Sequence, residues 1–463
     1  MPGDSRDYLD GGRSLLDRGT ILDSDGLPQT RRGPGYVPVV ALLDARPFAL
    51  TALNHVFGAL CAPLTFFLAL PLSRRIAVFA GSLVALHPDV VVWSDFVLSE
   101  SFFLVVMLAA LLLVQRSRYA LAGLLLGYAV VTRPIAVLVP VALALTLFRK
   151  RRAAAVLLAC GYLFPLLWIA RNRMEAGAAV LTSTAGENLL LWRAGGAVAM
   201  QDRGFTLSLL PSEREDALRH HLFAEVQPGL GRLALNEARA RYGPHPTHLQ
   251  TAEVSRSMGR QLILTTPIGF IESTFHAFVH MLCDPAEGWP FLGLALAVPL
   301  ALLALAGSLQ PRFALFSATL WSLVITTAGP EAATYTRFRL PLLPLMAILA
   351  AAAVDSLLKR VPLEPHLALR APARAEIAAE ELAAGRAAPG VGRDGGDGDG
   401  DRQGGPADDR DVEAEDRRVV DLAEGDGYEC GRADQHGQHD RKGAPARQLL
   451  AELLCLHRCV HGN

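Results

Sequence analysis

Long apolar runs constrain the fold of this chain more than any other feature of its sequence. A helix that crosses a bilayer needs about 20 consecutive, mostly apolar residues at a rise of 1.5 Å each. Six runs meet the requirement well: 54–72, 76–93, 97–114, 153–170, 289–307 and 340–358. A seventh run, 313–329, is slightly short for a span.

The stretch 119–148 is longer than one span needs, and Thr132-Arg133-Pro134 interrupts it. Because proline disfavours a helix at the residue before it, we interpret this stretch as two short helices that meet at the break. The total becomes about nine spans, which predicts an all-α polytopic membrane protein. The composition agrees with this class, since 51% of the residues are hydrophobic and 19% are charged. A formal net charge of -1 argues against a nucleic-acid binder, and the six cysteines follow no disulfide framework.

Basic residues indicate how the spans are oriented, because short cytoplasmic loops collect lysine and arginine. The chain has such residues at every second turn: Arg74-Arg75, Arg116, Arg118, 149–152, Arg312 and Lys359-Arg360. This pattern places the C-terminus in the cytoplasm. It predicts a first extracytoplasmic loop at 1–53, six spans in 54–170, a small, mainly helical extracytoplasmic domain at 171–288, three spans in 289–361 and a tail at 362–463.

The segments outside the predicted spans carry their own signals. Ser212 to Glu215 and Thr247 to Gln250 match the capping-box pattern, so each predicts the start of a helix. Apolar residues between Ile268 and Leu282 recur at helical spacing, which predicts a helix lying in the membrane interface. The tail is rich in Ala, Gly, Arg and Asp and predicts disorder. With nine spans and a cytoplasmic C-terminus, the polar segment 1–53 lies outside the cell. Such a segment needs a preceding span to carry it across the membrane, so we expect a further span upstream of Met1.

Polar residues beside the predicted spans gather on the outer side. Charges near hydrocarbon are costly, so each is a candidate functional residue. Guanidinium groups hold phosphate through paired hydrogen bonds, and a neighbouring carboxylate can take a proton from a hydroxyl. This combination predicts group transfer from a phosphate-bearing lipid donor. The residues are Glu100, Arg133, Arg171, Asn172, Arg337 and Arg339, together with acids from 1–53.

Other interpretations stay open. Glu100 also fits a charge favoured by a helix N-terminus, and each arginine fits anchoring to lipid headgroups. His276 and His280, four residues apart, could share a metal, although we favour a polar face on an interfacial helix and assign no metal ligand. For the whole chain, a polytopic transporter or lipid flippase is the main alternative, and an inactive truncated fragment is another. The spans show no internal repeat, which argues against a transporter.

Seven short motifs occur in a characteristic order over most of 1–360. They are GDSRDYLDGGRSLLDRG, RRGPGYVPVVALL, NHVFGAL, LHPDVVVWSDFVLSESFF, LAGLLLGYAVVTRP, WIARNRMEAGAAVLTSTAGENLLLW and TRFRLPLLPLMAILAA. Together they resemble the GT-C type membrane glycosyltransferases, specifically the bacterial relatives of dolichyl-phosphate-mannose protein mannosyltransferases and of the aminoarabinose transferase acting on lipid A. In that family a first transmembrane helix precedes the acid-bearing loop, and this chain begins at the loop.

The resemblance implies a multi-pass enzyme of the bacterial inner (plasma) membrane. Its donor would be a polyprenyl-phosphate sugar, and its acceptor a lipid, a protein or a polysaccharide. The sugar would move by inverting displacement, with Asp4 as general base and Asp7 as the second candidate. Glu100 would orient the acceptor or a divalent cation. The resemblance implies no other cofactor. The donor phosphate would be bound by Arg171, Arg337 and Arg339, with Arg133, Asn172 and Tyr335 as further candidates.

Overall fold

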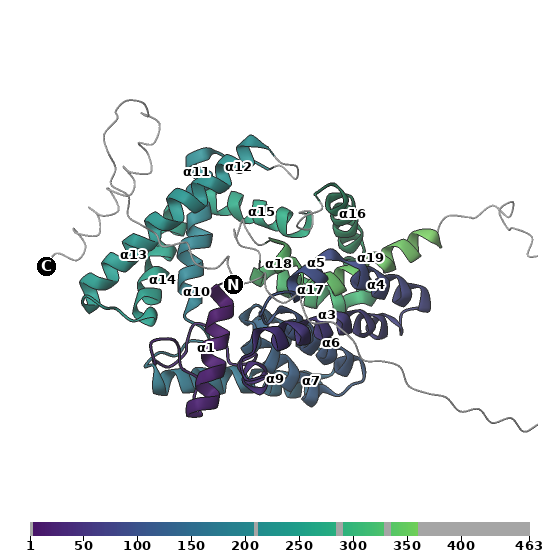
Figure 1. Cartoon of the computed structure of the whole chain (residues 1–463). Helices are drawn as coiled ribbons and strands as arrows, with labels where there is room; N and C mark the ends of the chain where they lie inside the picture. The colour runs from purple at the N-terminus through teal and green to yellow at the C-terminus, as the bar shows by residue number, and fades with distance from the viewer. Residues whose placement is uncertain (1–2, 208–211, 284–289, 328–334, 360–463) are drawn as a thin grey trace, which may run out of the picture. The chain divides into compact units, whose positions relative to one another are not determined.

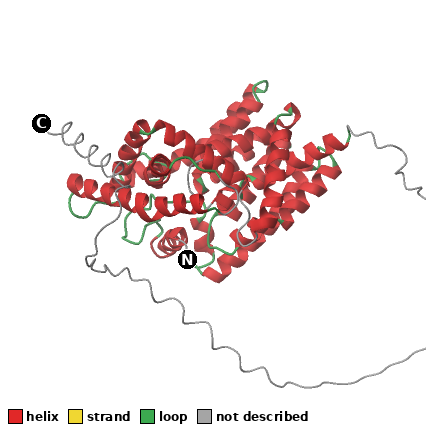
Figure 2. Ribbon diagram, turned by 90° about the horizontal axis from the view of Figure 1, so that it is seen from above, coloured by secondary structure: helices red, strands yellow, loops and turns green. Residues whose placement is uncertain are grey.

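The structure is a computed structural model that describes residues 3–207, 212–283, 290–327 and 335–359. All regular secondary structure in these ranges is helical, apart from an isolated antiparallel bridge between Leu22 and Pro28 (Figures 1 and 2). The prediction of an all-α fold is therefore confirmed for this part of the chain. The predicted disordered tail, 362–463, lies outside the described residues.

The N-terminal segment forms two helices joined by a loop. Tyr8 of the first helix packs edge to face on Tyr36, with ring centroids 5.3 Å apart. Both rings belong to a small buried cluster that also contains Leu50 and Val97, so the segment is fixed to the apolar helices that follow. The two helices are α1 (Gly3–Arg18) and α2 (Val37–Leu42).

The next part of the chain is a series of apolar helices that share one large buried core. The predicted interruption at Arg133 is confirmed, because α7 ends at Thr132, Arg133 is extended and a 3₁₀ helix starts at Pro134. Pro134 thus ends the helix, because its ring disfavours the helical conformation of the residue before it. The elements are α3 (Pro47–Ala69), α4 (Arg74–Leu86), α5 (Pro88–Ser94), α6 (Glu100–Gln115), α7 (Tyr119–Thr132), η1 (Pro134–Leu138), α8 (Val139–Thr146) and α9 (Arg151–Glu175).

A set of shorter helices follows α9, and the capping signals begin two of them as predicted. Ser212 accepts a hydrogen bond from the amide of Glu215, and Thr247 and Gln250 form a complete capping box. A separate apolar cluster around Leu190, Val254 and Leu262 holds part of this region together. The elements are α10 (Thr184–Glu187), η2 (Asn188–Ala194), α11 (Gly195–Arg203), α12 (Glu213–His220), η3 (His221–Val226), α13 (Gln227–Tyr242), α14 (His248–Thr265) and α15 (Pro267–Cys283).

The last described helices return to the large apolar core. One of them, α19, is buried along most of its length and packs against α16 and α4. The short α18, which precedes α19, packs against α5 and α15. The elements are α16 (Pro290–Ser308), η4 (Pro311–Phe313), α17 (Ala314–Thr327), α18 (Tyr335–Arg339) and α19 (Leu343–Leu358).

The described helices include two to five candidate membrane spans. Helices α3 and α9 are long and apolar enough to cross a membrane on their own. Three bent pairs pass the same test together: α4 with α5, α14 with α15, and the end of α16 with α17. Helices α6, α7 and α19, and η1 with α8, lie where other spans were predicted, but they are only 10–17 residues long. The count of nine stays a prediction, and pairing α14 with α15 as a span was not foreseen.

Candidate functional site

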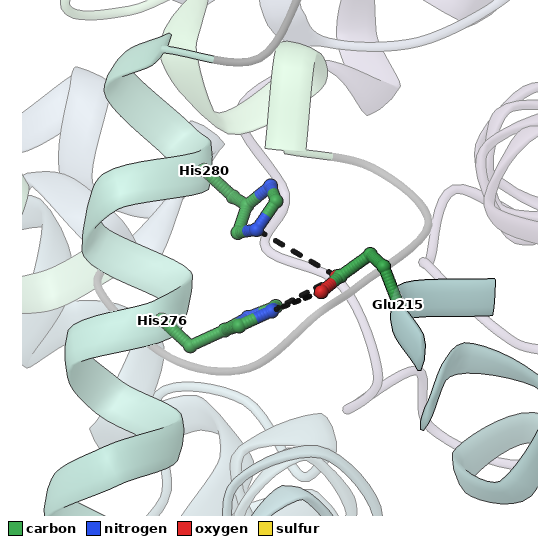
Figure 3. Close-up of side chains that lie close together, drawn as sticks. All are labelled: Glu215, His276 and His280. Carbon is green, nitrogen blue, oxygen red and sulfur yellow. Dashed lines mark hydrogen bonds and ion pairs between the residues drawn. The ribbon is translucent and has the colours of Figure 1, made fainter. Parts of the chain in front are cut away.

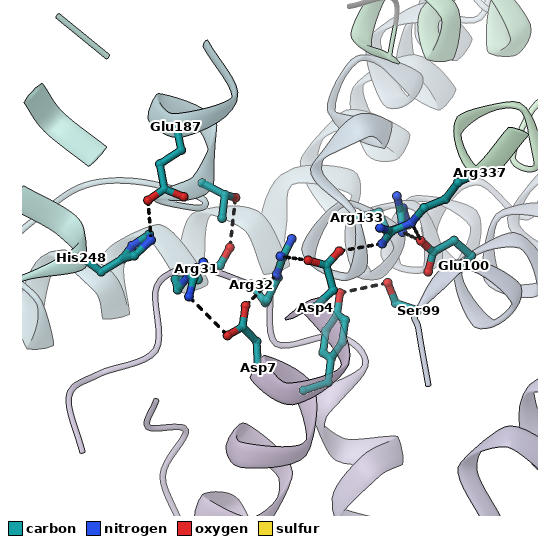
Figure 4. A network of polar contacts seen from close by, with 12 residues as sticks. Asp4, Asp7, Arg31, Arg32, Ser99, Glu100, Arg133, Glu187, His248 and Arg337 are labelled. Carbon is teal, nitrogen blue, oxygen red and sulfur yellow. Dashed lines mark hydrogen bonds and ion pairs between the residues drawn. The ribbon is translucent and has the colours of Figure 1, made fainter. Parts of the chain in front are cut away.

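Segments far apart in the sequence meet around Asp4, in the first turn of α1 (Figure 4). Arg337, in α18, lies between two carboxylates. Its Nη2 donates a hydrogen bond to Asp4 Oδ2 over 2.7 Å, and its Nε donates to Glu100 Oε1. Arg133 Nη1 lies 2.6 Å from the same Glu100 oxygen. On the other side, Arg32 donates to Asp4 Oδ1. The predicted residues Asp4, Glu100, Arg133 and Arg337 are therefore brought together.

The burial of these groups increases from Asp4 towards Glu100. The side chains of Arg32 and Asp4 are 24% and 22% exposed, whereas Arg337 is 14% exposed and Glu100 is fully buried. Glu100 Oε2 has no hydrogen-bond partner among the described residues. A buried acceptor of this kind carries a large desolvation cost, so it is suited to accept a hydrogen bond from a bound hydroxyl.

The network extends along the loop after α1. Arg32 Nε donates to Asp7 Oδ2 over 3.1 Å, and Arg31 Nη1 lies 3.6 Å from Asp7 Oδ1. Four arginines (31, 32, 133 and 337) and three acids (4, 7 and 100) are thus joined by ion pairs, which leaves one formal positive charge. An excess of guanidinium groups favours an anionic ligand such as a phosphate.

Two glycines allow the arginine-bearing loop to approach the end of α7. A Cβ on Gly33 would lie 1.9 Å from the carbonyl oxygen of Val131, and a Cβ on Gly35 would lie 2.1 Å from Thr132 Oγ1. Gly35 N also donates to the carbonyl of Val131 over 3.2 Å. Only glycine fits this close backbone contact, which places Arg32 on the loop beside Arg133 at the helix end.

A hydrogen bond sets the position of α1 relative to Glu100. The hydroxyl groups of Tyr8 and Ser99 are 3.0 Å apart. Tyr8 lies one turn after Asp4, and Ser99 directly precedes Glu100. The contact therefore holds the two carboxylates at a fixed separation, with Arg337 between them.

The charges around Asp4 control its protonation. Burial by itself raises the pKa of Asp4, but the nearby guanidinium groups of Arg32 and Arg337 outweigh burial and bring the pKa below its ordinary value. In turn, burial lowers the pKa of Arg337, while Glu100 and Asp4 raise it by more, so Arg337 stays charged. Asp4 is therefore an ionised carboxylate at neutral pH, as a general base must be before it accepts a proton.

Arg339 lies in a separate ion pair. Its side chain is 1% exposed, and its Nη2 and Nε donate to Asp89 Oδ2 over 2.6 and 2.9 Å. Asp89 belongs to α5, against which α18 packs. Arg339 therefore links α18, and thereby Arg337, to α5, while its assignment to the donor phosphate stays a prediction.

Arg171 contacts the loop between α1 and α2, and Asn172 contacts Arg171. Arg171 donates to the carbonyl oxygens of Gln29 and Ile21 over 3.0 and 2.9 Å, and it donates to Asn172 Oδ1. Asn172 is fully buried and donates to Val180 O. These contacts assign both residues to positioning the loop that carries Arg31 and Arg32. The side chain of Tyr335, a further sequence candidate, lies outside the described residues.

Two partners in these ion pairs were not singled out from the sequence. Arg32 is the nearest cation to Asp4, and Asp89 is the partner of Arg339. Arg32 lies in the motif RRGPGY, and Asp89 lies in the motif LHPD. The adjacent arginines and the aspartate beside an apolar run were the sequence signals that could have indicated these two residues.

Comparisons with known proteins give no further assignment. The chain matches no family model, no curated protein and no solved structure. Any functional conclusion therefore depends on the residues and their geometry.

Proposed function

We propose that this chain is a membrane glycosyltransferase that moves a sugar from a polyprenyl-phosphate donor to an extracytoplasmic acceptor. The observation that carries the proposal is the buried contact of Asp4 and Glu100 with Arg337, Arg133 and Arg32. It combines a candidate base with several phosphate-binding cations, next to helices able to span a membrane. The sequence motifs in the same segments resemble those of the GT-C type enzymes.

The proposed setting is a bacterial plasma membrane crossed by about nine spans, with the C-terminus in the cytoplasm. The network would then lie at the extracytoplasmic boundary, where α1, the loop before α2 and the start of α6 meet. A polyprenyl tail would remain in the lipid while its phosphate reaches the arginines. Two to five candidate spans support a membrane location, and the basic turns support the orientation.

The reaction follows from the charges. The acceptor hydroxyl gives its proton to the Asp4 carboxylate, and its oxygen attacks the anomeric carbon of the donor. The bond between that carbon and the phosphate oxygen breaks, and its electron pair leaves with the polyprenyl phosphate. Negative charge grows on the phosphate during this step, so pre-placed guanidinium groups stabilise the transition state more than the bound donor.

Arg337 links donor binding to the strength of the base. In the described arrangement Asp4 shares its oxygens between Arg32 and Arg337, which makes it a weak base. A donor phosphate would compete for the same guanidinium groups and partly release Asp4. Release from a positive charge raises the pKa of a carboxylate, so Asp4 would become a better proton acceptor once the donor is bound.

Glu100 has a supporting role in this scheme. It holds Arg337 and Arg133 through Oε1, while Oε2 is left to accept a hydrogen bond from the acceptor. Asp7 pairs with Arg32 and Arg31 over 3.1 and 3.6 Å and stays the second candidate for the base.

Asp4→Asn tests the proposal directly. The chain in detergent or nanodiscs is incubated with polyprenyl-phosphate mannose carrying a labelled sugar, together with membrane-derived acceptors, and free polyprenyl phosphate is measured. Loss of the general base should slow turnover by about 10²–10⁴-fold. Donor binding should persist, because Asn keeps the volume of the side chain and the arginines remain.

The matched control is Asp10→Asn, because Asp10 lies on the same helix and its ion pairs within the described part of the chain are with the exposed Arg6 and Arg13. It should leave turnover unchanged. Unaltered turnover in Asp4→Asn would refute the assignment of the base. Movement of labelled lipid between leaflets without release of polyprenyl phosphate would support the flippase alternative.

A further inference from the structure

A second buried polar cluster lies in the helices between α9 and α16, and the reaction proposed above does not use it (Figure 3). His276 and His280 occupy successive turns of α15, and Glu215 is in the first turn of α12. The three residues are 2%, 1% and 3% exposed. Their closest nitrogen and oxygen atoms all lie within 4.8 Å of one another.

Both histidines direct the same ring nitrogen at one carboxylate. His276 Nε2 lies 2.9 and 3.1 Å from the two oxygens of Glu215, and His280 Nε2 lies 3.6 Å from Oε1. The two rings are stacked at a tilt, with centroids 4.2 Å apart. The separation of four residues on a helix brings the two rings to the same face.

We propose that Glu215, His276 and His280 bind a divalent transition-metal ion, with Zn²⁺ as the preferred ion. Zinc bonds of about 2.0–2.1 Å in a tetrahedron place neighbouring ligand atoms roughly 3.3 Å apart. The observed N–O separations of 2.9 to 3.6 Å lie on both sides of this value. Two imidazoles with one carboxylate suit zinc and similar metals, whereas magnesium and calcium prefer oxygen ligands alone.

Another buried histidine of this region also contacts carboxylates, but its two ring nitrogens contact different ones. His221 uses Nδ1 for Glu225 at 3.0 Å and Nε2 for Asp202 at 3.2 Å. The two ring nitrogens point in opposite directions, so the two carboxylates cannot meet on one ion. His221 is therefore a matched control for the proposed site, since it is also buried and also paired with acids.

Among the described residues, Arg219 is a cation that approaches the proposed site. Arg219 Nε lies 3.4 Å from Glu215 Oε1, and the Arg219 side chain is 37% exposed. Because more than a third of this side chain already faces solvent, it can turn away when a metal takes its place. A metal with three protein ligands keeps a fourth position, which a water molecule can fill.

The ion would tie α12 to α15 across a sequence separation of 61 residues. Helix α15 packs against α18, which carries Arg337. The proposed metal would therefore stabilise the helices that support one side of the Asp4 network. The inference is independent of the sugar-transfer proposal, because its readouts are metal content and stability.

The test measures bound metal in the full chain. The protein is stripped with a chelator, exposed to excess ZnCl₂ and desalted, and zinc per chain is determined by mass spectrometry. Wild type and His221→Ala should retain the same amount, whereas His276→Ala/His280→Ala should bind one equivalent less. Cobalt added to stripped wild type should give the visible absorption of a four-coordinate nitrogen and oxygen site, and the double variant should not.

The thermal midpoint of unfolding distinguishes a variant that has lost the metal site from one that does not fold. Because a ligand that binds only the folded state stabilises it, zinc should raise the thermal midpoint of stripped wild type and of His221→Ala, but not that of Glu215→Gln. Equal zinc content in wild type and the double variant would overturn the proposal. Failure of zinc to raise the midpoint of wild type would do so as well.

Discussion

Glu100 is a buried carboxylate on which two arginines of the candidate site converge. Its carboxylate is fully buried at the N-terminal end of an apolar helix, and two guanidinium groups compensate its charge. Removing one member of a buried charge group leaves the others without compensation, which costs more than the pair contributes. The stability of the site and its chemistry therefore depend on the same residue.

Glu100→Gln is expected to destabilise the protein by about 3–5 kcal/mol, because Arg133 and Arg337 lose their shared negative partner. Thermal or denaturant unfolding in detergent measures the change. Asp95→Asn is the control, since Asp95 is 61% exposed and its pair with His55 lies at the surface. That variant should differ from wild type by less than about 1 kcal/mol. Equal stability of the two variants would contradict the description of Glu100 as the buried centre of the network.

If Asp4 is the general base, as proposed, Arg32 should set the acid limit of turnover through it. The pKa of Asp4 is lowered from 3.8, so the carboxylate is ionised above this pH and its contribution to stability is lost as pH falls through the folded-state pKa. Arg32 is the largest of the lowering influences. Arg32→Gln should therefore raise the pKa of Asp4 and move the acidic limb of the pH–rate profile to higher pH.

The pH profile of turnover, measured over the whole acidic range, checks this shift. Arg13→Gln provides the comparison, because Arg13 contacts only Asp10 on the exposed side of α1. Its profile should overlay that of wild type. A limb that stays in place in Arg32→Gln, or moves to lower pH, would show that Arg32 does not act on the catalytic group.

At the scale of elements, the loop between α1 and α2 is the part that assembles the site. It carries Arg31 and Arg32, and it reaches the end of α7 only because Gly33 and Gly35 lack side chains. Its other end is held by Arg171 from α9. The position of the arginines is thus determined by backbone contacts and not by their own side chains.

Gly35→Ala should displace this loop, since the added Cβ would lie 2.1 Å from Thr132 Oγ1 and 2.8 Å from backbone atoms of Thr132. Overpacking of this kind costs about 1–3 kcal/mol and moves the backbone. We expect at least about a tenfold loss of turnover, in line with the sensitivity of catalysis to small misplacements. Gly229→Ala is the control, because its added Cβ would meet no described atom within 4 Å apart from the adjacent residues and the backbone of its own helix. Similar losses in both variants would contradict a specific role for the loop contact.

Local signals in the sequence predicted three of the helix boundaries. The proline after Arg133 ends α7, and the capping residues Ser212 and Thr247 begin α12 and α14, because each effect depends only on neighbouring residues. The convergence of Asp4, Glu100 and Arg337 was predicted from topology and from the resemblance.

The exact pairing within the network was not predictable from the sequence. Arg339 and Arg337 are two residues apart, yet one pairs with Asp89 and the other with Asp4 and Glu100. Which arginine faces which acid depends on the direction of α18 relative to α5 and α6, a property of packing and not of spacing. For the same reason the sequence did not indicate Glu215, whose partner His276 lies 61 residues away.

At the scale of the whole molecule, the remaining question is how the helices cross the membrane. Nine spans were predicted from runs of apolar residues, whereas length and composition of the described helices support two to five. Helices α6, α7 and α19 are shorter than a full span, but they are largely buried within the large core. Shielding by neighbouring protein relaxes the need for apolar side chains but not the length needed to cross a bilayer, so the count of nine stays a prediction.

Side-specific labelling decides the topology. Arg239 and Arg152 are both exposed, but the predicted orientation places Arg239 outside the cell and Arg152 in the cytoplasm. In a background with the six native cysteines replaced, Arg239→Cys should react with a membrane-impermeant maleimide in intact cells. Arg152→Cys should react only after the membrane is permeabilised. Because 171–288 and the Asp4 loop are joined by contacts such as that between Thr30 and Ser183, the side found for Arg239 also gives the side of the candidate site. Labelling of Arg152→Cys in intact cells, with protection of Arg239→Cys, would place the site in the cytoplasm and exclude an extracytoplasmic acceptor.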